Sequence, residues 1–469
     1  MVKIMEQRLE FSEQLLLKYD QTGPRYTSYP TAVQFVPIFD AKKYQDISLK
    51  TSIENPAQPL SLYFHIPFCD TICYYCGCSK IVTRNYSLAV PYLEYLEKEM
   101  KLQAPLFAKR KVTQLHWGGG TPTFLDNQQM TDLMQMTRNA FDLDDSNQRE
   151  FSIEIDPRSV DKDKIELLAN IGFNRLSMGI QDFDPDVQKA VNRIQSKEDT
   201  LEVINHARQV GFESISVDLI YGLPKQKIST FTATLDAVIG AKPDRVAVYN
   251  YAHMPHLFKT QKGIKEVDLP TSEIKLQLLA LTIDKLTAAG YLYIGMDHFS
   301  LPDDELAIAQ RQGTLHRNFQ GYSTHAECDL IGLGLTSIGK VGNSYSQNEK
   351  DIEYYYAALD QNRLPILRGV ELDKDDIMRR HIISELMCHS TLIYSTINDK
   401  FDIDFKTYFK QELLDLESFT EDNLLIISAE GIQITPAGRM LIRNIGMQFD
   451  AYLKPGGRTG KTGTYSRLI

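Results

Sequence analysis

Four of the six cysteines in this chain of 469 residues lie within ten positions, and these are Cys69, Cys73, Cys76 and Cys78. Thiols so close together can form disulfides, bind zinc or hold an iron–sulfur cluster. Structural zinc usually takes two separated ligand pairs, whereas Cys328 and Cys388 are single and distant in sequence. One loop is better suited to one face of a cubane cluster, which ordinarily takes four cysteines. With three, one iron would stay open for a non-protein ligand.

Composition and charge exclude several classes of protein. The first twenty residues are charged throughout and lack the apolar core of a signal peptide. No apolar run approaches the ~20 residues that a membrane span needs. We therefore expect a cytoplasmic protein, whose thiols stay reduced, and this argues against a disulfide knot. A net charge of −10 without a basic block argues against general nucleic-acid binding.

From residue 60 to about residue 342, short β-rich runs alternate with helical runs. The predicted strands are 60–66, 112–117, 150–156, 175–181, 214–220, 245–251 and, less clearly, 291–299. The predicted helices between them include 90–104, 127–141, 197–211 and 272–290. Repeated strand–helix units imply a parallel sheet with right-handed crossovers. We predict an α/β fold, a partial or closed TIM-like (β/α) barrel.

Polar side chains stand near the ends of the predicted strands, and these are Glu154, Asp156, Gln181, Asp218, Asn250 and Tyr251. The cysteine loop follows the first predicted strand, and the run GGGTPT (118–123) follows the second. The carboxyl ends of the strands build the active site of a β/α barrel. We therefore expect all of these features at one mouth of the barrel.

Three segments are predicted along the chain. Residues 1–59 form an N-terminal extension covering the active site, 60–344 the barrel, and 345–469 a mainly helical C-terminal domain. In the last segment, 373–388 and 404–416 have the pattern of helices, and 424–449 that of a small hairpin followed by a helix.

The spacing C-x3-C-x2-C after a first strand is that of the radical S-adenosylmethionine (SAM) enzymes, and the GGGTPT run resembles their glycine-rich motif. A closer resemblance covers nearly the whole chain. It is carried by GPRYTSYPTA, YFHIPFCDTICYYCGCSK, HWGGGTPTFL, SIEIDPR, HRNFQGYSTH (316–325) and the terminal YSRLI. These motifs resemble the family of oxygen-independent coproporphyrinogen III oxidases, also named dehydrogenases.

The resemblance implies roles for individual residues. Cys69, Cys73 and Cys76 would ligate one [4Fe–4S] cluster, while Cys78 is typical of the family but not expected to be a ligand. If Cys78 were a fourth ligand, it would close the cluster and block activation of SAM. The residues that match positions around the SAM molecules are Tyr63, Gly119, Gly120, Thr121, Glu154 and Ile338.

The resemblance also implies that a second SAM binds beside the first. Its matching positions here are Tyr75, Gln181, Arg193, Asp218 and Ala252. Position 75 is often Phe in the family, and stacking should survive the change to Tyr. Candidates to contact the substrate are Arg25, Tyr26, His316, Arg317, Asn318 and Gln320. Cys328 and Cys388 are most simply buried small apolar residues.

The activity implied is the oxygen-independent conversion of two propionates of coproporphyrinogen III to vinyls, which gives protoporphyrinogen IX in heme biosynthesis. It would use a 5′-deoxyadenosyl radical from SAM, an unidentified reductant and an electron acceptor. The resemblance further implies a monomer. Two alternatives remain, a heme-binding or heme-delivering relative that keeps the cluster and a radical methyltransferase acting on another tetrapyrrole.

Overall fold

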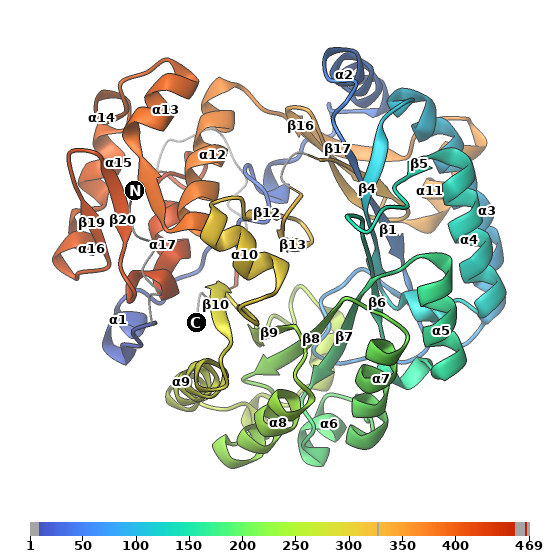
Figure 1. Cartoon of the computed structure of the whole chain (residues 1–469), viewed down its shortest axis with the longest axis horizontal. Helices are drawn as coiled ribbons and strands as arrows, with labels where there is room; N and C mark the ends of the chain where they lie inside the picture. Colours follow the sequence, from blue (N-terminus) through green and yellow to red (C-terminus); the bar gives the residue numbers. More distant parts are fainter. Residues whose placement is uncertain (1–8, 326–327, 455–464, 467–469) are drawn as a thin grey trace. The chain divides into compact units, whose positions relative to one another are not determined.

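The computed structural model describes residues 9–325, 328–454 and 465–466, which divide between two compact units (Figure 1). The sheet unit comprises Phe35–Thr271 and Glu327–Glu371, and the helical unit comprises Met1–Gln34, Ser272–Ala326 and Leu372–Ile469. Each unit takes residues from more than one of the three segments predicted from the sequence. The three-part division therefore stays a prediction. Within the described part of the chain, every helix is too short or too polar to cross a membrane.

The sheet unit is built on one large sheet. Its strands are β1 Leu60–Ile66, β4 Lys111–Gly119, β5 Asp142–Leu143, β6 Glu150–Ile155, β7 Arg175–Gln181, β8 Ser214–Tyr221, β9 Arg245–Asn250, β14 Asp329–Leu333, β15 Ile338–Val341, β16 Ser344–Asn348 and β17 Ile366–Glu371. They run in the order β9-β8-β7-β6-β4-β1-β14-β15-β16-β17, with β5 beside β4. From β9 to β14 all neighbours are parallel, as are β4 and β5, and the neighbours from β14 to β17 are antiparallel. In the described residues β9 and β17 do not pair with each other, so the barrel is partial.

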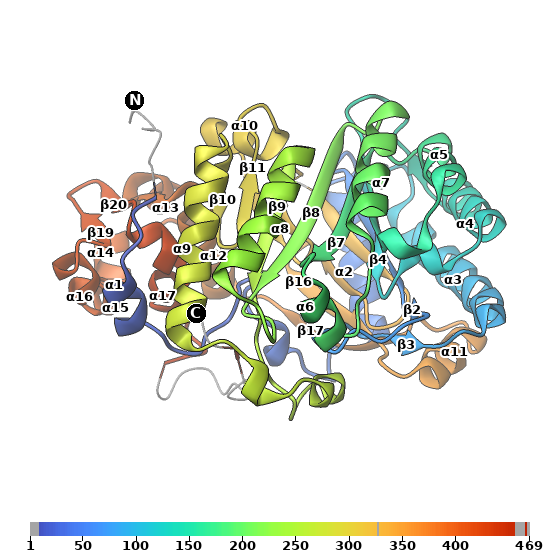
Figure 2. The same cartoon turned by 90° about the horizontal axis from the view of Figure 1, so that it is seen from below.

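Helices cover the outer face of the parallel strands, as α3, α4, α5 and α7 show (Figure 1, Figure 2). The helices of this unit are α2 Ala41–Glu54, α3 Ala89–Gln103, α4 Asn127–Ala140, α5 Lys162–Ile171, α6 Pro185–Ala190, α7 Lys197–Gln209, α8 Ile228–Ala241 and α11 Ile352–Asp360. Short 3-10 turns are η2 Tyr86–Leu88, η3 Ala104–Phe107, η4 Pro122–Phe124, η5 Pro157–Ser159, η6 Lys259–Gly263 and η7 Glu266–Asp268. Side chains start several helices by capping free N–H groups, as Asp126 does for α4.

Six of the seven predicted strands are confirmed to within two residues at each end. Strand β1 is buried at every position except Tyr63, as expected for a parallel strand covered on both faces. The seventh prediction, a single strand over 291–299, is wrong. That run makes two short antiparallel strands of the helical unit, β10 Leu292–Gly295 and β11 His298–Ser300. A turn at Met296, whose φ is +50°, interrupts the apolar run. Strand β1 has β4 as one parallel neighbour and β14 as the other, and the sequence did not indicate β14.

The helical unit packs around its own apolar core. Its helices are α1 Glu13–Lys18, α9 Ser272–Ala288, α10 Glu305–Gln312, α12 Lys374–His389, α13 Tyr394–Phe401, α14 Phe405–Tyr408, α15 Lys410–Asp415, α16 Glu417–Glu421 and α17 Ile442–Met447, with η1 Ala32–Gln34 and η8 Gly438–Leu441. Its further strands are β12 His316–Asn318, β13 Gly321–Ser323, β18 Thr391–Ile393, β19 Leu425–Ile427 and β20 Gly431–Ile434. The core takes Leu16, Tyr26 and Tyr29 from the N-terminal segment together with side chains of α12 and α17. The predicted hairpin and helix of 424–449 are confirmed, whereas the predicted helix 404–416 is divided into α14 and α15.

Both isolated cysteines are buried, as predicted. Cys388 lies in a small apolar cluster of the helical unit, and Cys328 precedes β14 in the sheet unit. The remaining cysteines all belong to the sheet unit.

Candidate functional site

The cysteine loop leaves the carboxyl end of β1 and is closed at its base by backbone pairing. Two residues before the loop form β2 (Phe68–Cys69), which pairs in parallel with β3 (Ile81–Val82) after it. The N–H of Ile81 donates to Pro67 O (2.7 Å), and that of Thr83 donates to Cys69 O (2.8 Å). The loop therefore has fixed ends, although it contains no regular structure of its own.

The glycine run after β4 lies directly against the start of this loop. The N–H groups of Gly120 and Thr121 donate to Ile66 O and Phe68 O, both at 2.8 Å. A Cβ atom on Gly120 would stand 2.6 Å from the carbonyl oxygen of Pro67. Backbone this close to backbone excludes a side chain at Gly120. In the structure, this glycine serves the contact between the two loops.

Cys69 is the most buried of the four clustered cysteines. The hydroxyl of Thr121 donates to its Sγ at 3.4 Å. Burial raises the pKa of the Cys69 thiol to about 11, although that hydrogen bond opposes the change. A metal centre would have to supply the charge that stabilises the thiolate here.

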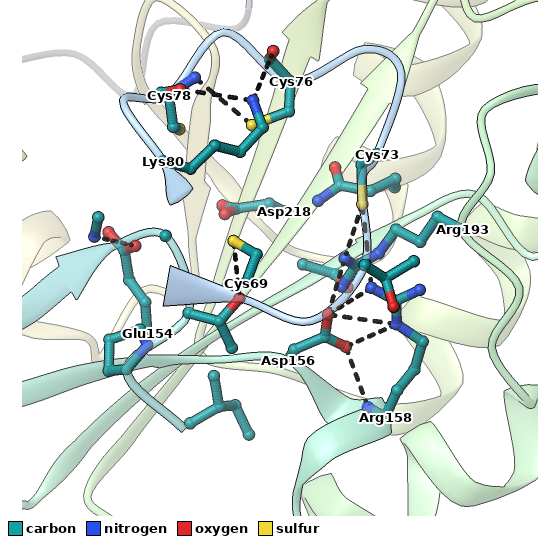
Figure 3. A pocket seen from close by; sticks show the side chains of 18 of the residues that line it. Cys69, Cys73, Cys76, Cys78, Lys80, Glu154, Asp156, Arg158, Arg193 and Asp218 are labelled. Carbon is teal, nitrogen blue, oxygen red and sulfur yellow. Dashed lines mark hydrogen bonds and ion pairs between the residues drawn. The ribbon is translucent and has the colours of Figure 1, made fainter. Parts of the chain in front are cut away.

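Cys73 lies among arginines (Figure 3). Its Sγ is 3.6 Å from Arg193 Nη1 and 3.9 Å from Arg158 Nη2. Both guanidinium groups are held by Asp156, whose Oδ2 lies 3.1 Å from Arg193 Nη1 and 2.6 Å from Arg158 Nη2. Burial alone would raise the pKa of Asp156, but Arg193 and Arg158 lower it to about 2. This ionised carboxylate thus positions two cations at the sulfur.

Cys76 and Cys78 occupy another part of the same wall, with Lys80 (Figure 3). The backbone N–H of Cys78 donates to Cys76 Sγ at 3.4 Å, and Lys80 Nζ donates to the carbonyl of Cys76 at 3.2 Å. A hydrogen bond from the Cys78 thiol and the nearby Lys80 lower the pKa of Cys76 to about 6, against the effect of burial. Cys76 is therefore readily ionised, as a metal ligand must be.

Strand ends supply the polar groups that share the cavity with the cysteines. Glu154 Oε1 is 3.1 Å from His116 Nε2, and its Oε2 accepts from the N–H of Gly119 at 3.3 Å. Asp218 makes no hydrogen bond to any described residue, and burial together with the charge of Glu154 raises its pKa to about 7. Gln181 has a φ of +66° at a register shift of β7, and its Oε1 is buried without a partner.

One cavity collects these side chains, with about 790 Å³ of space free of protein atoms, part of it open to solvent. It brings together thirteen residues that the sequence analysis named, and these are Cys69, Cys73, Tyr75, Cys76, Cys78, Gly119, Gly120, Thr121, Glu154, Asp156, Gln181, Arg193 and Asp218. Of the six strand-end groups expected at one mouth, Glu154, Asp156, Gln181 and Asp218 line this cavity, whereas Asn250 and Tyr251 do not.

Three further residues named for SAM do not line the cavity. Tyr63 stacks on His116, with the two ring centroids 5.8 Å apart. Ala252 follows β9, and its carbonyl accepts from Gln261 Nε2 (3.1 Å), which also donates to Tyr75 O (3.2 Å). Ile338 begins β15.

The six substrate candidates all belong to the helical unit. Arg25 Nη1 pairs with Asp297 Oδ2 at 2.5 Å, and the hydroxyl of Tyr26 donates to Asp450 at 2.9 Å. His316, Arg317 and Asn318 form β12, which pairs with β13. Gln320 lies in the turn between these two strands, and its N–H donates to Asn318 Oδ1 at 2.9 Å.

Asp156, Arg158 and Lys80 also line the cavity; Asp156 was expected there only as a strand-end group, and the other two were not named. The signal for the first two was present, since SIEIDPR ends a predicted strand and carries both. Their link to Cys73 was not visible, because it joins residues 85 positions apart.

The residues of the cavity fit an iron–sulfur cluster and a polar cofactor. No three His, Cys, Asp or Glu side chains in the described ranges converge closely enough to hold one metal ion. In a cubane cluster, however, each cysteine binds a different iron, so the thiols need not converge on one point. Cations stand near Cys73 and Cys76, and the unpartnered Gln181 Oε1 and Asp218 offer acceptors to a ligand. Cys69, Cys73 and Cys76 would hold the cluster.

Comparisons with known proteins agree with this arrangement. Residues 63–238 match the Radical SAM superfamily, and residues 372–441 match the HemN C-terminal domain. The chain is 48% identical to the oxygen-independent coproporphyrinogen III oxidase of Salmonella typhimurium over 99% of its length and 100% of that protein. It is 49% identical to the same-named protein of Pseudomonas aeruginosa over 95% of its length and 96% of that protein.

A solved structure is similar as well. Coproporphyrinogen III oxidase (HemN) from Escherichia coli, described as a radical SAM enzyme, matches with a TM-score of 0.90 and 47% identity. The match covers 95% of this chain and 100% of that one. With such identity over nearly its full length, the chain belongs to the oxygen-independent coproporphyrinogen III oxidase family of radical SAM enzymes.

Proposed function

We propose that this protein converts two propionate side chains of coproporphyrinogen III to vinyl groups without oxygen, giving protoporphyrinogen IX for heme biosynthesis. The observation that carries the proposal is the near-full-length similarity to several proteins of that name, at 47–49% identity in the relatives of Salmonella, Escherichia and Pseudomonas. The arrangement of cysteines, glycines and strand-end carboxylates around one cavity supports it.

The chemistry requires a hydrogen atom to leave the carbon β to each carboxylate. Loss of CO₂ and one electron from the resulting substrate radical then forms the double bond, and an electron acceptor must take that electron. A [4Fe–4S] cluster with SAM, when bound, supplies the carbon radical that removes the hydrogen. The protein's part is to hold these groups in place and to exclude competing reactions.

For the described residues we assign roles as follows. Cys69, Cys73 and Cys76 bind the cluster, and Asp156 orients Arg158 and Arg193 so that their charges stabilise the Cys73 thiolate. Asp218 and Gln181 accept hydrogen bonds from the cofactor. Asp218 suits an amine or hydroxyl donor, because such a donor favours its ionised form.

Several finer expectations belong to the same proposal. Two SAM molecules bind, the protein acts as a monomer in the cytoplasm, and a separate reductant and electron acceptor serve it. The number of SAM molecules is testable by equilibrium dialysis of the anaerobic, cluster-loaded protein, for which two per chain are expected. A value of one would contradict the assignment of Tyr75, Arg193 and Asp218 to a second molecule.

The test of function measures two products together. The protein is prepared without oxygen, reconstituted with iron and sulfide, and given reductant, SAM, coproporphyrinogen III and an electron acceptor. We expect both 5′-deoxyadenosine and protoporphyrinogen IX. If 5′-deoxyadenosine forms without the porphyrin product, the substrate is wrong. If neither forms while the cluster is intact and heme binds tightly, the protein is a heme carrier instead.

A further inference from the structure

Four arginines from distant parts of the sequence gather in the helical unit. Arg25 comes from the N-terminal segment, Arg317 from β12, Arg439 from η8 and Arg443 from α17, and together they are named the arginine cluster. The charges of Arg25 and Arg317 both act on Arg443. The charges of Arg317 and Arg439 both act on the hydroxyl of Tyr322.

Positive charge exceeds negative charge around Arg443. The carboxylate that acts on Arg443 and Tyr322 is Asp297, and Arg25 Nη1 pairs with its Oδ2 at 2.5 Å. Among the charges that act on Arg443, the guanidinium groups of Arg25 and Arg317 thus outnumber one carboxylate, although Arg443 is only 8% exposed. Burial, with the charges of Arg25 and Arg317, lowers the pKa of Arg443 to about 9. An additional anion would relieve this repulsion.

Two members of the cluster keep donors that nothing in the described chain uses. The Nε and Nη1 atoms of Arg317 are buried without a hydrogen-bond partner, and its guanidinium lies 4.8 Å over the ring of Tyr322. Buried donors nearly always have an acceptor. Arg317 is not explained by packing alone, because a ring contact leaves its in-plane donors unsatisfied.

Arg443 binds the N-terminal segment with only two of its three guanidinium nitrogens. Its Nη2 donates to Gly23 O at 2.6 Å and its Nε to Pro24 O at 3.2 Å. These bonds hold the N-terminal segment, yet Nη1 donates to no described residue. Arg443 is therefore both an anchor for that segment and a source of a free donor.

We propose that Arg317 and Arg443 bind a propionate carboxylate of the tetrapyrrole substrate, with Arg25 and Arg439 adding positive charge. This rests on the proposed function and adds Arg439 and Arg443, which the sequence analysis did not name. A guanidinium presents a planar fork that matches a carboxylate.

The direct test is binding of coproporphyrin III, the oxidised and air-stable relative of the substrate, to the full-length protein without its cluster. Porphyrin fluorescence is titrated at constant ionic strength for the wild type, Arg317→Gln and Arg443→Gln. We expect each substitution to weaken binding by about tenfold or more, as for loss of a charge-assisted hydrogen bond. The tetramethyl ester of coproporphyrin III, which lacks carboxylates, should bind all three proteins equally weakly.

Arg311→Gln is the matched control. Arg311 lies in α10 of the same unit, is exposed, and donates to Pro302 O at 2.7 Å. The substitution Arg311→Gln removes the same charge as the two test variants but leaves the arginine cluster intact. Porphyrin binding should therefore stay within about twofold of the wild type. If Arg317→Gln and Arg443→Gln also bind like the wild type, or if the ester binds as tightly as the acid, the proposal is overturned.

Steady-state measurements separate this site from the rest of the machinery. In Arg317→Gln, which loses no hydrogen bond to the chain, we expect KM for coproporphyrinogen III to rise while the iron content and SAM cleavage without substrate stay unchanged. An unchanged KM with normal product formation would overturn the arginine site and leave the proposed function intact. If porphyrin binding depends on the arginines but no vinyl groups form, the arginine site stands and the proposed function is overturned.

Discussion

The three proposed cluster ligands have different surroundings, and the contrast is greatest at Cys73. Cys69 is buried beside the hydroxyl of Thr121, whereas the Cys73 sulfur faces two guanidinium groups held by Asp156. Positive charge close to a sulfur stabilises its thiolate. Because a thiolate-bound cluster carries negative charge, Arg158 and Arg193 also suit the loaded site.

The roles of Cys73 and Cys78 can be separated by replacing each with alanine. In Cys73→Ala we expect most of the reconstituted iron and the visible absorbance of the cluster to be lost. In Cys78→Ala we expect both to be kept, since the backbone N–H of residue 78 still donates to the Cys76 sulfur when the Cys78 thiol is lost. Iron and sulfide analysis with absorbance spectra measures this. Equal loss of iron in both variants would make Cys78 a fourth ligand.

At the scale of elements, the glycine run and the cysteine loop stabilise each other. In Gly120→Ala, the new methyl group would stand 2.6 Å from a backbone oxygen that cannot rotate away. We expect the free energy of unfolding to fall by about 1–3 kcal/mol and iron incorporation to fall with it. Urea unfolding and iron analysis measure the two effects.

Gly240→Ala is the control for that substitution. Gly240 lies in α8, and no atom stands within 4 Å of its added Cβ. Alanine is favoured over glycine in a helix by roughly 0.5–1 kcal/mol, so this variant should be slightly more stable than the wild type. If both alanine variants had the same stability, close packing at Gly120 would not be the cause.

Helix α3 contributes a buried carboxylate that joins it to the strands beyond β14. Glu99 accepts from the N–H of Gly334 (2.8 Å), Asn348 Nδ2 (2.7 Å) and the hydroxyl of Tyr355 (2.6 Å). Burial raises the pKa of Glu99 to about 7, although these hydrogen bonds oppose the change. The folded state therefore holds this proton more tightly than the unfolded chain does.

This carboxylate predicts a pH dependence with a definite sign. The free energy of unfolding should decrease as the pH rises from about 4.5 to 7, because protonation favours the folded state in that range. The contribution is on the order of 3 kcal/mol at 1.36 kcal/mol per pKa unit. Urea unfolding of the wild type and Glu99→Gln across this range should differ by this slope. Identical slopes would contradict the assignment.

At the scale of the whole molecule, the N-terminal segment belongs to the core of the helical unit. Leu16, Tyr26 and Tyr29 are buried there, and Arg443 binds the carbonyls of Gly23 and Pro24. Removing residues 1–31 would expose that core and free the arginine. The residues of the cysteine site lie in the sheet unit and keep all their described contacts.

We therefore expect the protein without residues 1–31 to incorporate iron normally but to lose most of its turnover and the stability of the helical unit. Iron analysis, product formation and protease sensitivity of residues 372–454 measure these effects. Deletion of residues 1–8 alone removes none of the named side chains and is the matched control. Loss of the cluster in the longer deletion would contradict this division of tasks.

The net charge of −10 describes the molecule as a whole but neither of its candidate binding sites. Cations gather at Cys73 in the sheet unit and in the arginine cluster of the helical unit. An acidic protein can thus bind acidic ligands through a few local arginines, and the overall charge governs solubility and long-range steering instead.

The sequence by itself determined the features that depend on residues close together along the chain. The cysteine spacing, six parallel strands and most helices follow local patterns of residue type, and those patterns identified the family's motifs. Only the tertiary structure decided which distant residues meet. It placed β14 beside β1, turned 291–299 into a hairpin, joined Arg158 and Arg193 at Cys73, and gathered Arg25, Arg317, Arg439 and Arg443. Local periodicity encodes which face of an element is buried but not its partner, so these contacts required the fold.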